Sequence, residues 1–211
     1  MPIAREGLPL IGLSLGFAIL LFASGLTVLS IICFFFFLFF LFFFRNPKRI
    51  PLKNDDAFIS PADGKIIDIG IVDEDEFIKD RTRRICIFMS PLDVHVNRSP
   101  LSGRVIRVQH RKGEFAVAFK KDIDKQNERN YILIQRGEEK ILVVQVAGFL
   151  ARRIISYVKE GDVLKKADPL GMIAFGSRVD IYFPQDYESV VELGMKVKAG
   201  VTPLTKTKVD L

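Results

Sequence analysis

The stretch GMIAFGSRVDIYF, residues 171–183, holds two runs of strand-forming residues joined by a Gly-Ser pair. The first run ends at Phe175, the second begins at Val179, and both are rich in Ile, Met, Val, Phe and Tyr. Runs of this composition that are bounded by turn residues predict β-strands. A Gly-Ser pair between them predicts, by itself, only a turn. The stretch therefore indicates a β-rich domain and leaves open why Ser177 stands at this junction.

Strand-like runs of the same kind fill most of the chain after Arg45. They are bounded by Gly, Pro, Asp and Asn, and helical periodicity is scarce, with short helices expected only around 91–94 and 115–120. The remaining runs are GKIIDIGIV (64–72), RRICIFMS (83–90), GRVIRVQ (103–109), NYILIQ (130–135), KILVVQVAG (140–148) and RRIISYV (152–158). We predict a mainly β domain, built as a sandwich or a partly closed barrel.

Two related turn patterns occur in this domain, VKEGDVLKKADPLGMI (158–173) and VELGMKVKAGVTPL (191–204). Each places a glycine in a tight turn, then an apolar residue, then a second turn before a strand. The patterns resemble the sandwiched hairpins of biotinyl and lipoyl domains. Such a likeness concerns the fold and carries no function by itself.

Residues 8–44 carry no charged side chain, which predicts a membrane segment. One straight helix of this length would extend roughly 55 Å, against a hydrocarbon core of about 30 Å. Ala23-Ser24-Gly25 breaks the run, so we expect a helical hairpin with spans at about 8–22 and 26–44, in an anchor that covers 1–45. Two alternatives stay open: a shallow or re-entrant insertion of the short first span, and a signal peptide cleaved at the break.

Arg5 precedes the apolar run, and Arg45, Lys48 and Arg49 follow it. Positively charged flanks stay in the cytoplasm. We therefore expect both ends of the hairpin, and the domain 46–211, on the cytoplasmic side of the inner cell membrane. A net charge of +6 beside such an anchor favours anionic lipid headgroups as partners. Nucleic acid is not expected, because no basic stripe is interleaved with exposed aromatic residues.

Cys33 lies in the apolar run and Cys86 in a strand-like run. Two isolated cysteines form neither a disulfide framework nor a zinc site, and a reduced cytoplasmic face suits them. We expect no metal.

Three motifs stand out: SPADGK (60–65), MSPLDVHVNRSP (89–100) and FGSR (175–178). Taken singly, Asp63 and Ser177 are ordinary turn residues and His95 is an ordinary packed or surface histidine. Together they supply a carboxylate, a base and a hydroxyl, and a serine needs a base before it becomes a nucleophile. Spacing does not show that they meet, so a Ser-His-Asp site is a hypothesis at this point.

In this order the motifs resemble the phosphatidylserine decarboxylase proenzyme family, in its short form with Gly-Ser-Arg at the processing site. The resemblance covers nearly the whole chain, and it includes FFRNPKR (43–49), GEFAVAF (113–119) and NER (127–129). It implies an enzyme of phospholipid biosynthesis that converts phosphatidylserine into phosphatidylethanolamine. A membrane phospholipid is then the substrate, with its diacyl or ether backbone left open.

The resemblance gives the Gly176-Ser177 bond a role. It implies that Ser177 attacks the carbonyl of Gly176 and that the chain divides into 1–176 and 177–211, which stay together as a heterodimer. Ser177 then becomes a pyruvoyl group, the covalent cofactor and electron sink. His95 is implied as the base, with Asp63 holding its imidazole, and again as the acid of turnover. A higher oligomer is left open.

The chain departs from the family's longer members in the histidine loop. Those members carry a second histidine three residues after the first, where this chain has Arg98. Either His95 serves both steps or His110, the only other histidine, supplies one of them; a surface position is the plain alternative for His110. Arg178 replaces the threonine of the commoner motif. Arg98 and Arg178 are candidate contacts for the carboxylate or phosphate of the substrate.

Two functions from other classes compete with this one. A membrane-anchored adaptor or carrier of the biotinyl or lipoyl type would use Lys196, which follows a methionine in a tight turn. A serine hydrolase would use the same three residues, Asp63, His95 and Ser177, and would keep one uncut chain.

Overall fold

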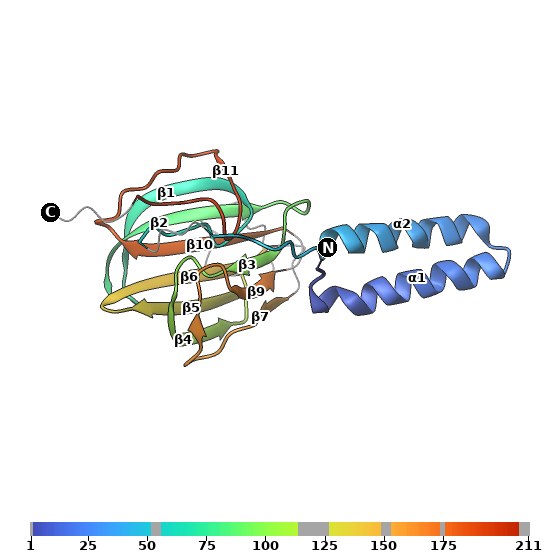
Figure 1. Ribbon diagram of the computed structural model, residues 1–211, viewed down its shortest axis with the longest axis horizontal. Helices are drawn as coiled ribbons and strands as arrows, with labels where there is room; N and C mark the ends of the chain where they lie inside the picture. Colours follow the sequence, from blue (N-terminus) through green and yellow to red (C-terminus); the bar gives the residue numbers. More distant parts are fainter. Residues whose placement is uncertain (1, 52–55, 114–126, 149–152, 174–175, 207–211) are drawn as a thin grey trace. The chain divides into compact units, whose positions relative to one another are not determined.

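The computed structural model describes residues 2–51, 56–113, 127–148, 153–173 and 176–206. The chain forms two compact units, residues 1–48 and 49–211. The first unit has a short 3-10 helix, η1 (Arg5–Gly7), followed by two antiparallel α-helices, α1 (Leu8–Ala23) and α2 (Thr27–Phe43) (Figure 1). These helices begin and end within one residue of the spans expected from the sequence.

The turn of the hairpin depends on Gly25, which has φ of +77°. Glycine adopts this left-handed conformation without the steric cost that other residues meet. The two helices are also joined by a side chain, because the hydroxyl of Ser30 on α2 donates to the carbonyl of Ala18 on α1 at 2.7 Å. At the open end, the amide of Ala4 donates to the carbonyl of Phe44 at 2.8 Å. The two ends of the hairpin therefore lie together.

The surface of this hairpin is apolar. Phe22 and Val28 are 68% and 72% exposed, and most other large side chains of α1 and α2 are also exposed. Within the described residues, the helical segment Arg5–Ala23 is long and apolar enough to cross a membrane, whereas Thr27–Phe43 is apolar but shorter. An exposed apolar surface of this extent indicates membrane association. Whether the hairpin crosses the bilayer, and in which direction, stays a prediction.

The second unit is mainly β, as predicted. Its strands are β1 (Gly64–Glu74), β2 (Asp80–Met89), β3 (Val96–Arg98), β4 (Gly103–Arg111), β5 (Arg129–Arg136), β6 (Glu139–Ala147), β7 (Ile154–Ser156), β8 (Val163–Leu164), β9 (Pro169–Ile173), β10 (Ser177–Pro184) and β11 (Lys196–Val197). Eight of them form one antiparallel sheet in the order β11-β1-β2-β10-β6-β5-β4-β8. This sheet curls into a half-barrel, and a small sheet, β3-β9-β7, lies beside it (Figure 1).

Strand β10 lies in the middle of the large sheet, between β2 and β6. Because side chains of a strand alternate between faces, Val179, Ile181 and Phe183 enter the hydrophobic core on the inner face, and each is 0% exposed. Arg178 and Asp180 therefore point to the outer face. Ser177 has the same parity as the core residues, so its side chain belongs to the inner face.

The differences from the sequence-based expectation are local. Residues 91–93 form a turn rather than a helix, since the Asp93 carboxylate accepts a hydrogen bond from the amide of Ser90 at 2.8 Å. The helix expected at 115–120 falls outside the described residues. The likeness to biotinyl and lipoyl hairpins is not confirmed, because within 158–173 β8 pairs with β4 and β9 pairs with β3 and β7.

The two units give a first prediction. A chain that begins at Asn46 keeps Arg49 and the whole second unit, so it should remain folded without detergent. We expect a β-type circular dichroism spectrum, cooperative thermal unfolding and much weaker co-sedimentation with anionic vesicles than the full chain shows, because the apolar hairpin is absent. An aggregated or unfolded product would show that the β unit needs the hairpin to fold.

Candidate active site

Ser177 is the first residue of β10 and is fully buried. It is paired on both sides, with Met89 at the end of β2 and with Ala147 at the end of β6. Its hydroxyl donates to the sulfur of Met89 at 3.5 Å. A thioether is a weak acceptor, so this bond orients the hydroxyl without activating it. Strand pairing on both sides thus fixes the backbone of Ser177. The sulfur of Met89 is no base, so the hydroxyl keeps its proton.

Gly176, which precedes it, has φ of +62°. A Cβ added here would meet no atom of the described residues within 4 Å. The position therefore needs glycine for its left-handed backbone rather than for lack of space. Its carbonyl is the one that Ser177 would attack, and sparsely populated backbone conformations are found at reactive sites.

His95 lies at the same end of the domain through strand pairing. Strand β3 pairs with β9, so Val96 is opposite Met172. The amide of Ile173, three residues before Gly176, donates to the carbonyl of His95 at 3.4 Å. The loop that carries His95 begins at Met89, which is paired with Ser177. It ends at β3, which is paired with β9, the strand that precedes the Gly-Ser bond. The histidine itself is fully buried.

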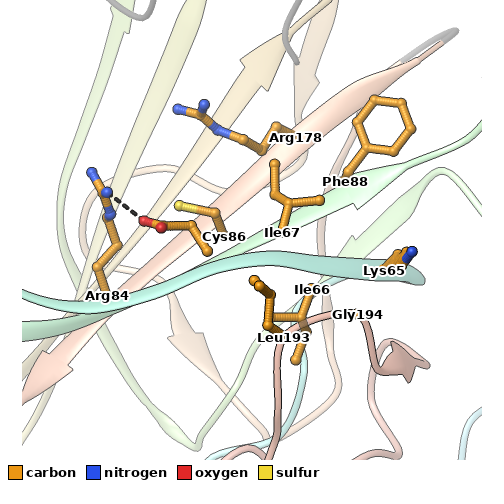
Figure 2. A pocket seen from close by; sticks show the side chains of 10 residues that line it. Lys65, Ile66, Ile67, Arg84, Cys86, Phe88, Arg178, Leu193 and Gly194 are labelled. Atoms are coloured by element: carbon orange, nitrogen blue, oxygen red, sulfur yellow. Dashed lines mark hydrogen bonds and ion pairs between the residues drawn. The ribbon is translucent and has the colours of Figure 1, made fainter. Parts of the chain in front are cut away.

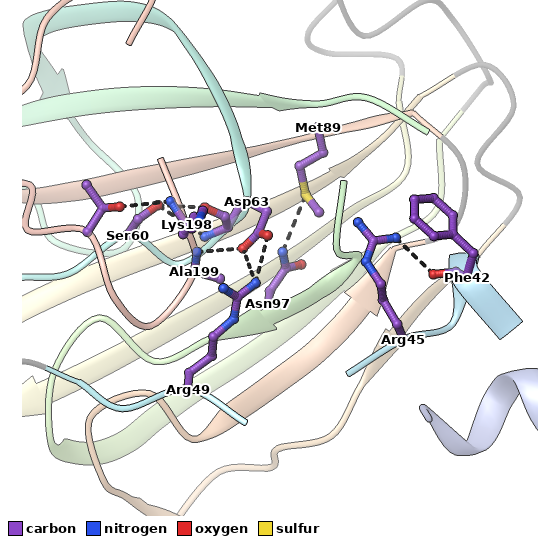
Figure 3. A network of polar contacts seen from close by, with 11 residues as sticks. Phe42, Arg45, Arg49, Ser60, Asp63, Met89, Asn97, Lys198 and Ala199 are labelled. Carbon is purple, nitrogen blue, oxygen red and sulfur yellow. Dashed lines mark hydrogen bonds and ion pairs between the residues drawn. The ribbon is translucent and has the colours of Figure 1, made fainter. Parts of the chain in front are cut away.

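Asp63 is held by a different set of groups from the one expected. Nη2 of Arg49 donates to its two carboxylate oxygens at 2.9 and 2.7 Å, and the amide of Ala199 donates to one of them at 2.7 Å (Figure 3). Burial raises the pKa of the Asp63 carboxyl, while the charge of Arg49 and the Ala199 amide oppose that shift. The orientation of His95 by Asp63 stays a prediction. Arg49, which the sequence marks only as a membrane-flanking charge, is its partner here.

Arg98 belongs to the same cluster. Its guanidinium is buried and donates to the carbonyl of Ala167 at 2.9 Å. Burial lowers the pKa of Arg98, the charge of Arg49 lowers it further, and the charges of Asp63 and Asp168 act in the opposite direction. Two guanidinium groups and two carboxylates therefore interact beside the SPADGK loop. Arginine side chains are donors of the kind that bind an anionic group of a substrate.

His110 is farther from Ser177. It lies on β4, three strands away from β10, which is about 14 Å along the sheet. Its Nε2 is 3.2 Å from Oε1 of Glu128, and 41% of its side chain is exposed. It borders a cavity of about 520 Å³. The other residues around this cavity are Lys112, Gly113, Glu128, Arg153 and Ile154. This position favours His95 over His110 as the group that acts on Ser177.

A family model described as phosphatidylserine decarboxylase matches residues 36–205. This chain belongs to the phosphatidylserine decarboxylase family. The motif-based expectation of the family is thus confirmed, and the match includes Asp63, His95 and Ser177.

Individual relatives agree with the family. A protein of Carboxydothermus hydrogenoformans named phosphatidylserine decarboxylase proenzyme is 44% identical over 181 residues, which cover 85% of each chain. One of the same name from Syntrophus aciditrophicus is 40% identical over 208 residues, 96% of each chain. A protein of Methanopyrus kandleri named putative archaetidylserine decarboxylase proenzyme is 44% identical over 188 residues, covering 85% of this chain and 87% of that one. All three names describe a precursor of a decarboxylase.

In this member of the decarboxylase family, Arg178 is engaged in an ion pair. Its Nε lies 2.8 Å from Oδ1 of Asp180, and its Nη2 donates to Oδ2 at 2.9 Å. Both residues are almost fully buried on the outer face of the sheet, opposite to Ser177. The pair explains the arginine structurally, and its contact with substrate stays a prediction.

A cavity of about 690 Å³ lies on that outer face, beside Arg178 (Figure 2). Its other lining residues are Lys65, Ile66, Ile67, Asp68, Arg84, Cys86, Phe88, Leu193 and Gly194. Arg84 is paired with Asp68 at 2.6 Å. Burial, and secondarily the charge of Asp180, raise the pKa of the Cys86 thiol. The described residues hold no cluster of three or more His, Cys, Asp or Glu side chains that could bind a metal.

Sequence reasoning missed four polar or sulfur-bearing residues behind Ser177: Met89, Asn97, Asn130 and Gln145. Asn97, Asn130 and Gln145 are 0–1% exposed. The sequence pattern could have indicated two of them, because Asn130 and Gln145 occupy core-facing positions of otherwise apolar strands, and buried amides need hydrogen-bond partners.

The raised pKa of Cys86 gives a second prediction. Only the thiolate reacts with iodoacetamide, so in a Cys33→Ala chain Cys86 should be alkylated more than about tenfold more slowly at pH 8 than in the same chain unfolded in urea. Intact mass follows the reaction. Equal rates in the folded and unfolded chain would contradict the buried position of this thiol.

The Arg49–Asp63 pair gives a third prediction. Arg49→Met should lower the free energy of unfolding by roughly 3 kcal/mol, because it leaves a buried carboxylate without its cation. Its effect should fade as the pH drops through the raised pKa of Asp63, since the protonated carboxyl needs no cation. Adding Asp63→Asn should restore much of the lost stability at neutral pH. Thermal unfolding at several pH values checks this, and an equal loss in the single and double variants would contradict it.

Proposed function

We propose that this chain cleaves itself between Gly176 and Ser177 and then decarboxylates phosphatidylserine to phosphatidylethanolamine. One observation carries the proposal. A buried serine follows a glycine with φ of +62°, at the end of the domain to which strand pairing brings His95. Family membership gives this arrangement its reaction class, because the relatives are named as decarboxylase proenzymes.

The cleavage needs only groups of the chain and water. His95 takes the proton of the Ser177 hydroxyl, Oγ bonds to the carbonyl carbon of Gly176, and the C–N bond breaks as the nitrogen receives a proton. An ester then links the two residues. Removal of the Ser177 Cα proton breaks the Oγ–Cβ bond and releases the carboxylate of Gly176. Water replaces the nitrogen on the new N-terminal residue, ammonia leaves, and a pyruvoyl group remains.

The site suits that group. Ser177 is the end of a strand that is paired on both sides, so the new terminus stays fixed between Met89 and Ala147. The pyruvoyl group would supply a ketone that condenses with the amine of the lipid, with loss of water, and so provides an electron sink for the departing carbon dioxide. His95 then delivers a proton to the substrate carbon. The cationic pair Arg49 and Arg98 binds an anionic group of the lipid.

The two products of cleavage remain one folded unit. The smaller chain, 177–211, supplies β10 in the middle of the large sheet and β11 at its edge. It also supplies the Ala199 amide that holds Asp63 of the larger chain. Separating the chains would break the interfaces of β10 with β2 and β6 and expose the core, which supports a tight heterodimer.

The apolar hairpin fits a membrane lipid as substrate. With cationic residues at both of its ends, we place the β unit on the cytoplasmic side of the membrane. Relatives named for archaetidylserine differ from the others in the lipid that they are named for, so both a diacyl and an ether-linked serine lipid are substrates to assay.

The competing functions have less support. An adaptor of the biotinyl type has no counterpart in the family match, and Lys196 lies in β11, paired with Lys65 of β1. A serine hydrolase would keep one uncut chain, whereas the relatives are named as proenzymes.

A fourth prediction tests the proposed roles. His95→Ala should slow self-cleavage by about 10²–10⁴-fold, because the serine loses its base. Asp63→Asn should slow it less, and His110→Ala should change it least, since His110 lies three strands away. The measurement is the fraction of cleaved chain with time on a denaturing gel after cell-free synthesis, followed by turnover of phosphatidylserine per cleaved chain.

Ser177→Ala is the control, and it should give one uncut band without decarboxylation. Two chains in that variant would exclude Ser177 as the nucleophile. Normal cleavage in His95→Ala with blocked cleavage in His110→Ala would reverse the assignment of the base.

A further inference from the structure

A chain of buried amides leads to Ser177 through the core. The amide nitrogen of Asn130 on β5 donates to Oε1 of Gln145 on β6 at 2.9 Å. Nε2 of Gln145 donates to Oδ1 of Asn97 on β3 at 2.8 Å. Nδ2 of Asn97 donates in turn to the sulfur of Met89 at 3.5 Å, the contact drawn in Figure 3. That sulfur is also the acceptor of the Ser177 hydroxyl. These four hydrogen bonds connect the large sheet to the small one and end at the hydroxyl oxygen of Ser177, the proposed nucleophile.

The backbone makes room for this series. Asn97 is paired with Gly171 on β9. A Cβ at Gly171 would lie 3.0 Å from Nε2 of Gln145 and 2.4 Å from the carbonyl of Ile155. Only glycine at this position lets the Gln145 amide reach from the large sheet to the small one without a shift. The close packing of β6 against β9 at Gly171 therefore permits the hydrogen bond between Gln145 and Asn97.

The amides are a costly way to fill a core. Burying such groups is unfavourable unless each is hydrogen-bonded, and apolar residues of similar shape would stabilise the fold at least as well. What the series does provide is a fixed orientation, because hydrogen bonds define one rotamer where apolar packing allows several. The end of the series is Met89, a side chain with three rotatable bonds that would otherwise adapt its position.

We propose that Asn130, Gln145 and Asn97 are positioning residues for self-cleavage, which act by fixing the sulfur of Met89 and thereby the rotamer of Ser177. The inference rests on the proposed function and adds to it the groups that aim the nucleophile. Met89 is the only member that contacts the reacting oxygen among the described residues. The amides act through it, so their effect on cleavage must disappear when the sulfur is absent.

A double-mutant cycle tests this dependence. The variants are Gln145→Met, Met89→Leu and both together, in the full chain made by cell-free synthesis in lipid nanodiscs. Met and Leu have similar volumes, so Met89→Leu should keep the fold. Gln135→Met is the matched control, because Gln135 lies on neighbouring β5 and its amide donates only to the nearby carbonyl of Gly137 in the described structure. The rate of cleavage is read from quenched time points.

Each single change should slow cleavage by about tenfold or more, since a small misplacement of a reacting group costs up to ~10²-fold. In the Met89→Leu background, Gln145→Met should slow cleavage no further, because its effect travels through the sulfur. Thermal unfolding, measured on the same variants with Ser177→Ala added, should instead show a loss from Gln145→Met in both backgrounds. The control should cleave like the unchanged chain.

A Gln145→Met effect of equal size in both backgrounds would overturn the proposal, since the amides would then act only through stability. So would normal cleavage in either single variant. If Gln145→Met does not fold, Gln145→Glu replaces it: its protonated carboxyl still donates to Asn97, so cleavage relative to the unchanged chain should rise as the pH falls from 8 to 6. A flat ratio would overturn the proposal. An unchanged chain that stays uncut would instead refute the proposed function itself.

Discussion

The site depends on the pairing of β10 with both β2 and β6. These two strands are far apart in the sequence, and the last long strand of the chain completes the sheet between them. The pairing begins at Ser177 and fixes this residue between Met89 and Ala147 before any chemistry occurs. The pairing of β10 also limits the structural effect of cleavage. A break just before β10 would cut the covalent chain and leave the sheet intact, so the new terminus would stay at the position of Ser177.

Contacts on both sides of the proposed cleavage site hold the segments that carry His95 and Asp63. On one side, β9 leads into Gly176 and carries the backbone of His95 along its edge. On the other, the segment after β11 returns to the SPADGK loop, where Ala199 donates to Asp63. The carboxylate is thus held by Arg49, which precedes the proposed cleavage site, and by an amide that follows it. Cleavage there would leave these contacts in place.

The sequence predicts the local features of this structure and not the long-range ones. Runs of β-branched and aromatic residues mark β1, β2, β4, β5, β6, β7, β9 and β10 in the sequence. The short strands β3, β8 and β11 lie in no such run, so the sequence does not mark them. The place of β10 in the sheet order has no local signal at all. The sequence likewise indicates Arg49 only as a residue that flanks the membrane segment. It does not connect Asn130 and Gln145 with Asn97, because only the pairing of separate strands brings these residues together. Asp63, His95 and Ser177 are found through their motifs, whose order along the chain is itself the signal.

Intact mass spectrometry of the purified protein shows whether Ser177 becomes the reactive terminus of a second chain. We expect two chains, 1–176 and 177–211, whose masses add up to that of the full chain plus one water minus one ammonia. Borohydride together with phosphatidylserine should add mass to the smaller chain alone, through the amine of the lipid. A single uncut chain, or a smaller chain that still begins with an unmodified serine, would rule out the conversion of Ser177 into a pyruvoyl group.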